Sequence, residues 1–149
     1  MTYFSSLRVP MWLLNGAIAL SFLTSHALAD GAIAIGTSGN VEKFGYALGI
    51  AVNQISKAEA RAEALRLCQN DETAGNSPGK SKCQVVKTFR GQCAAEVNDP
   101  APGTSGWGWA IARDQRAAEK IALGECIKRS SAERRDACQV IRSACDSAP

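Results

Sequence analysis

The chain has 149 residues, of which 46% are hydrophobic, so it is long enough to form one domain with a buried core. Seventeen Lys and Arg residues against 14 Asp and Glu residues give a formal net charge of +3. A charge this small argues against nucleic acid as a partner.

The N-terminus is organised like a secretory signal peptide. Arg8 is its positive residue, residues 9–23 are mostly apolar, and Ala27-Leu28-Ala29 matches an A-x-A cleavage site. We expect residues 1–29 to be removed and a single domain to span 30–149, with no membrane span remaining. An uncleaved membrane anchor is the alternative. The prediction places the protein in the periplasm or outside the cell.

The only histidine, His26, lies inside the predicted signal peptide. The processed chain would therefore have no imidazole, which excludes a Ser-His-Asp triad, a Cys-His pair and a histidine zinc site. The rest of the chain also lacks a glycine-rich phosphate loop and an EF-hand loop. We expect no cofactor, no metal and no enzymatic activity.

In the first half of the predicted domain, we expect two strands, a helix and a third strand, at residues 32–35, 44–52, 58–68 and 83–89. Ser56 and Glu59 have the spacing of a capping box and predict where the helix begins. The helix is rich in alanine, which indicates close packing, and it ends at Cys68.

The second half repeats this order, with segments at 93–97, 107–112, 115–127 and 138–142. Cys83-Gln84-Val85 recurs as Cys138-Gln139-Val140, and Asp114 is a candidate N-cap for the second helix. Such a repeat indicates two copies of one unit, at about 30–90 and 91–149. The predicted fold class is α+β: two ββαβ repeats forming a largely antiparallel sheet, packed by two helices and stapled by disulfides.

All six cysteines follow the predicted signal peptide, which is typical of a disulfide framework. Cys68 and Cys126 end equivalent helices. Cys83 and Cys138 begin equivalent strands. The repeat therefore predicts one bridge in each unit, leaving a third that we expect to cross-link the halves: Cys68–Cys83, Cys126–Cys138 and Cys93–Cys145. The alternative, a metal or redox site, lacks C-x-x-C spacing.

Two aromatic residues in the second half are candidate binding residues. Trp107 and Trp109 are two positions apart in one predicted strand, so their side chains point to the same face. If exposed, they could form with Tyr46 a platform for a sugar or a protein partner. The alternative is that both tryptophans pack under the second helix as part of the core.

Three carboxylates, Glu96, Asp99 and Asp114, flank the second predicted hairpin and could converge near its end. A pair of carboxylates can hydrolyse a glycosidic bond, although this spacing is not diagnostic.

Several segments together resemble one family of secreted bacterial proteins, domain of unknown function 4189 (DUF4189). They are Gly31-Ala32-Ile33-Ala34, Cys83-Gln84-Val85-Val86, Gly91-Gln92-Cys93-Ala94-Ala95, Gly106-Trp107-Gly108-Trp109 and the two helices that end at Cys68 and Cys126. The resemblance implies export and disulfides, and it implies no catalytic residues. We expect an exported, non-enzymatic domain that binds a protein partner. A cell-wall carbohydrate-binding module or a carboxylate-based hydrolase is the alternative.

Overall fold

The structure is a computed structural model and describes residues 30–146. The predicted signal peptide, residues 1–29, lies outside the described residues, as do residues 147–149. Between residues 30 and 146, no helix combines the length and the apolar character needed to cross a membrane.

The first ββαβ unit forms a three-stranded antiparallel sheet in the order β2-β1-β3. Its elements are β1 (Asp30–Thr37), α1 (Val41–Phe44), β2 (Tyr46–Gln54), α2 (Lys57–Gln69), η1 (Glu72–Ala74), η2 (Pro78–Lys82) and β3 (Gln84–Phe89). The helix α2 begins where the capping box predicts, because Ser56 Oγ accepts a hydrogen bond from the backbone N–H of Glu59 at 3.2 Å.

The second unit repeats this topology in a sheet of order β5-β4-β6. Its elements are β4 (Cys93–Asn98), β5 (Trp107–Ala112), α3 (Gln115–Arg129), η3 (Ala132–Ala137) and β6 (Gln139–Cys145). Asp114 caps α3 by accepting a hydrogen bond from Ala117 N at 2.8 Å. The α+β class and the antiparallel pairing agree with the predicted fold. However, the two repeats form two separate sheets rather than one continuous sheet.

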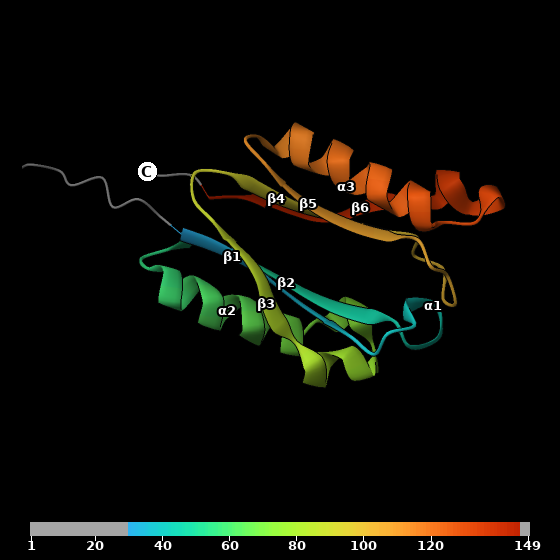
Figure 1. The fold of residues 1–149 in the computed structure, drawn as a ribbon, viewed down its shortest axis with the longest axis horizontal. Helices are drawn as coiled ribbons and strands as arrows, with labels where there is room; N and C mark the ends of the chain where they lie inside the picture. Colours follow the sequence, from blue (N-terminus) through green and yellow to red (C-terminus); the bar gives the residue numbers. More distant parts are fainter. Residues whose placement is uncertain (1–29, 147–149) are drawn as a thin grey trace, which may run out of the picture.

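The two sheets stack face to face, with α2 covering the outer face of one and α3 covering the outer face of the other (Figure 1). Strand alternation explains this four-layer arrangement. In β1, for example, the small Ala32 and Ala34 face α2, whereas the larger Ile33 packs between the sheets. Because each sheet has apolar residues on both faces, both faces must be buried against another helix or sheet.

Each helix lies very close to its sheet, because the facing positions are small. The fully buried residues of the helices are alanine and cysteine only: Ala60, Ala64 and Cys68 in α2, and Ala118, Ala122 and Cys126 in α3. Gly49 of β2 and Gly108 of β5 lie opposite these faces. A Cβ at Gly108 would lie 2.4 Å from the carbonyl oxygen of Ala122, so this contact requires glycine.

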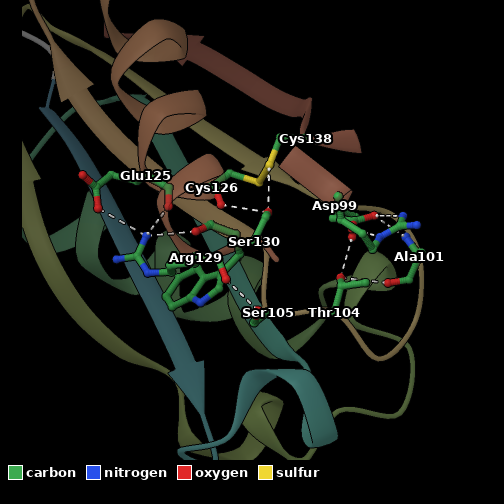
Figure 2. The surroundings of a disulfide bond; sticks show 11 residues. Asp99, Ala101, Thr104, Ser105, Glu125, Cys126, Arg129, Ser130 and Cys138 are labelled. Carbon is green, nitrogen blue, oxygen red and sulfur yellow. Dashed lines mark hydrogen bonds and ion pairs between the residues drawn. A yellow bond between two sulfur atoms is a disulfide. The ribbon is translucent and has the colours of Figure 1, made fainter. Parts of the chain in front are cut away.

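The structure joins the six cysteines as Cys68–Cys83, Cys126–Cys138 and Cys93–Cys145, the three pairs expected from the repeat. The first two tie the end of a helix to the start of the following strand, and Ser130 Oγ donates to the carbonyl oxygen of Cys126 beside one of them (Figure 2). The expectation that the third bridge links the halves is wrong. Cys93 and Cys145 are directly paired in β4 and β6, so this bridge lies within the second sheet.

Candidate functional site

An open groove of about 680 Å³ lies between the two sheets, with residues of β1 and β3 on one side and of β5 on the other. Its apolar lining comes from Ile35, Val86, Trp107 and Trp109, and its polar lining includes Thr37, Ser81 and Gln84. Among residues 30–146, Lys82 is the only charged residue that lines it. The groove therefore combines an aromatic wall with a wall of mixed aliphatic and polar side chains, and Lys82 adds one positive charge.

The two tryptophans line this groove from β5. The intervening Gly108 faces α3, as its close approach to Ala122 shows, so alternation turns Trp107 and Trp109 toward the first sheet. Both indoles are half-buried and pack against the apolar cluster between the sheets. They do not pack under α3, which corrects the alternative placement expected from the sequence.

Trp107 is held in place by two neighbours. The ring of Tyr46 stacks on it, with 4.7 Å between ring centroids and an interplanar angle of 30°. The guanidinium carbon of Arg129 lies 5.2 Å from the Trp107 ring centroid. Arg129 is fixed in turn, because it donates to the Trp107 carbonyl oxygen at 2.9 Å and pairs with Glu125 at 3.4 Å (Figure 2). The Trp107 indole is thus pre-positioned.

Tyr46, the third predicted binding residue, supports the site rather than lining it. Its side chain is buried, and its hydroxyl donates to Glu96 Oε1 at 2.7 Å. Burial and the neighbouring Glu96 raise the pKa of Tyr46, so the phenol stays neutral and keeps donating this hydrogen bond.

Behind Tyr46, a buried charge cluster joins the two repeats. Arg142 of β6 pairs with Glu96 Oε2 at 2.6 Å and with Asp71 Oδ1 at 2.8 Å. The second oxygen of Asp71 accepts a hydrogen bond from Leu48 N at 2.9 Å, which anchors the cluster to β2. Glu96 and Asp71 are 0% and 4% exposed, so within residues 30–146 Arg142 is the one cation that pairs with two buried carboxylates.

The two carboxylates of this cluster have opposite pKa shifts. Burial raises the pKa of Glu96 to about 7, although Arg142 and Tyr46 oppose the shift. Burial alone would also raise the pKa of Asp71, but hydrogen bonds from Leu48 N, Arg142 and Thr73 hold it below its usual value. One cation between two buried acids thus favours one ionised and one partly protonated carboxyl group.

We expect Glu96→Gln to change how the free energy of unfolding depends on pH. The folded-state pKa of Glu96 lies above its usual 4.5, so its stabilising contribution is complete below that value and is lost as pH rises through about 7. Because one pKa unit corresponds to about 1.36 kcal/mol, the contribution of Glu96 to the free energy of unfolding should fall by up to roughly 3 kcal/mol between these two pH values. Measured by urea unfolding across this pH range, the free energy of unfolding of Glu96→Gln should vary less with pH than that of the parent protein. The variant Glu59→Gln, which changes an exposed residue, should show the same pH dependence as the parent. Parallel profiles for Glu96→Gln and the parent would contradict this account.

The predicted convergence of carboxylates does not occur. Asp99 precedes β5 and accepts two hydrogen bonds from Arg134, one of them at 2.6 Å. Asp114 follows β5 as the cap of α3, so β5 separates the two residues by roughly 20 Å at about 3.3 Å per residue. Each of these carboxylates has a structural partner, and Glu96 is buried away from the groove.

A second, smaller cavity of about 370 Å³ lies beside α1, where residues 98–104 form its other wall. Phe44 and Tyr46 line it, together with several Gly, Pro and Ala residues. Within the described part of the chain, no group of three or more His, Cys, Asp or Glu side chains is placed to hold a metal ion.

The spacing of Trp107 and Trp109 predicts the wall formed by β5 but not the opposite wall, which includes Ile35, Lys82 and Val86. The alternation of Ile33 and Ile35 with small residues was the available signal, because it shows that the larger side chains of β1 share one face. No sequence signal indicates that Arg142 reaches both Glu96 and Asp71.

The family model described as "Domain of unknown function (DUF4189)" matches residues 31–145. Neither the curated proteins nor the solved structures contain a match to this chain.

Proposed function

Because the chain belongs to the DUF4189 family, whose description assigns no activity, we propose a function from the surface that the domain presents. We propose that it is an exported, non-enzymatic domain that binds a partner protein in the groove between β3 and β5. The observation that carries the proposal is the pair of half-buried tryptophans facing Ile35 and Val86 across an open groove.

The composition of the groove favours a polypeptide. Aromatic side chains that are fixed by neighbours and keep part of the ring accessible are typical of binding hot spots, since little conformational entropy is lost when they are covered. Tyr46 and Arg129 fix Trp107 in this way. The wall opposite the indoles combines the aliphatic Ile35 and Val86 with the polar Gln84, which suits a peptide because a peptide carries both apolar and polar groups.

Three disulfides support the proposed export. Such bridges persist in oxidising, extracytoplasmic environments and are rare where thiols are kept reduced. The predicted signal peptide at residues 1–29 points the same way.

The absence of a converging acid pair at the groove supports a binding role over hydrolysis. In the described part of the chain, Lys82 is the only titratable residue that lines the groove, and Asp99 is engaged by Arg134. A hydrolase built on two carboxylates needs both beside the bond to be cleaved.

We expect Trp109→Ala to weaken partner binding by at least roughly tenfold, because a hot-spot residue contributes about 2 kcal/mol or more. The oxidised protein would be incubated in parallel with envelope extract, culture supernatant and isolated cell wall, and the Kd of a captured protein would then be measured. Phe44→Ala is the matched control, since Phe44 is a 39% exposed aromatic residue that lines the other cavity.

Three outcomes would contradict the proposal. Retention on the cell wall alone would favour a carbohydrate-binding module. Turnover of a cell-wall or peptide substrate would indicate an enzyme. Loss of binding in Phe44→Ala but not in Trp109→Ala would move the site to the cavity beside α1.

A further inference from the structure

The strand that borders the groove has an unpaired side. β3 is the last strand of the order β2-β1-β3, and within residues 30–146 it pairs with β1 alone. Gln84 and Val86 line the groove from this strand, and Val86 is 45% exposed. Unpaired backbone N–H and C=O groups therefore lie beside a groove with exposed apolar side chains, which is the arrangement that accepts an added strand.

The charged residues of the segment that contains β3 all have one sign. Residues 73–95 contain no Asp or Glu, and their four cations are Lys80, Lys82, Lys87 and Arg90. Arg90 pairs with Asp30 at 2.9 Å, whereas no ion pair within the described residues uses the three lysines. Lys82 and Lys87 are exposed at the start and in the second half of the β3 region. A partner at this edge would be favoured by negative charge.

We propose that the groove takes an extended acidic segment of a partner protein, which adds to β3 as a fourth strand of the first sheet. Alternate side chains of the segment would enter the groove against Trp109 and Val86, and its carboxylates would lie beside Lys82 and Lys87. This inference rests on the proposed function, because it names the chemistry of the partner at the same site.

A second copy of this chain is a poorer occupant of the same edge. Two β3 strands paired with each other would bring the lysines of one copy against those of the other, and like charges across paired strands destabilise them. An acidic segment removes this repulsion and adds attraction.

The test uses the oxidised protein and a displayed library of random linear peptides of roughly ten residues. We expect the selected peptides to contain apolar residues together with Asp or Glu, and their binding to weaken as salt rises. The double variant Lys82→Glu/Lys87→Glu should lose roughly tenfold or more in affinity. The matched control Lys57→Glu/Lys120→Glu, which changes exposed lysines on α2 and α3, should bind like the parent.

Amide hydrogen exchange distinguishes strand addition from side-chain docking. We expect the bound peptide to protect the β3 amides that do not bond to β1, with little change in β6, the corresponding edge of the second sheet. A library that yields no binder or only basic binders, protection confined to other elements, or a dimer with protected β3 would each overturn the inference. Partner binding that depends on Trp109 but not on these lysines would overturn it while leaving the proposed function intact.

Discussion

Gly108→Ala is expected to lower the free energy of unfolding by about 3 kcal/mol or to prevent folding. A Cβ at this position would lie 2.4 Å from the Ala122 carbonyl oxygen and 2.8 Å from Cys126 N, both in the backbone of α3. Overpacking a core usually costs about 1–3 kcal/mol, and a backbone that cannot move aside places the cost at the upper end. The Cys126–Cys138 bridge restrains the end of α3 nearest this contact.

The repeat supplies a second copy of this test, and α3 supplies a control. Gly49→Ala should behave like Gly108→Ala, because its Cβ would lie 2.3 Å from the Ala64 carbonyl oxygen. Gly124→Ala should be neutral or stabilise by up to about 1 kcal/mol, because alanine favours a helix and, within residues 30–146, no atom outside the local helix backbone lies within 4 Å of the added Cβ. Guanidinium unfolding with the disulfides intact measures all three. A Gly108→Ala protein as stable as the parent would contradict the close packing of α3 on β5.

Arg142→Met is expected to cost about 3 kcal/mol or more at neutral pH. The substitution keeps much of the side-chain volume but leaves the buried Asp71 and Glu96 without their shared cation. Removing one partner of a buried ion pair typically costs about 3–5 kcal/mol. The variant should be most stable relative to the parent at low pH, because protonation removes the negative charges of the two uncompensated carboxylates. The difference in free energy of unfolding between parent and variant should grow as pH rises.

Two further variants make this prediction specific. Arg61→Met removes an exposed arginine from α2 and should change stability little. Glu96→Gln placed in the Arg142→Met protein should recover part of the loss, because one of the two uncompensated charges is gone. If Arg142→Met and Arg61→Met unfold at the same urea concentration across the pH range, the cluster does not hold the repeats together.

Local signals in the sequence predicted the elements well. Ser56 and Asp114 cap the helices that they were expected to begin, since a cap depends only on residues a few positions away. The internal repeat predicted which cysteines pair, because equivalent cysteines occupy equivalent places in the two units.

The stacking of the sheets was harder to predict. Alternation in β1 distinguishes a small face, with Ala32 and Ala34, from a large face, with Ile33. It does not say whether the large face meets a helix, a second sheet or a partner. The prediction of one sheet packed by two helices was therefore consistent with the sequence. However, strands that are apolar on both faces require a covering layer on each side of every sheet.

Only part of the candidate site could be predicted, because some of its contacts depend on how the two sheets stack. Trp107 and Trp109 share a face by strand periodicity alone, and that prediction needs no tertiary information. Tyr46 reaches Trp107 only because the two sheets stack, and Arg142 meets Glu96 only through the β4–β6 register. Contacts between segments so distant in the chain cannot be read from the spacing of residues in one sequence.

The most direct test of the proposed binding site is a map of backbone amide chemical shifts as the protein is titrated with the partner or peptide that it captures. The account predicts that the shift changes concentrate on β3 and β5, with the indole N–H of Trp109 among the largest. Changes concentrated around Phe44 and the cavity beside α1, or on the outer faces of α2 and α3, would contradict it.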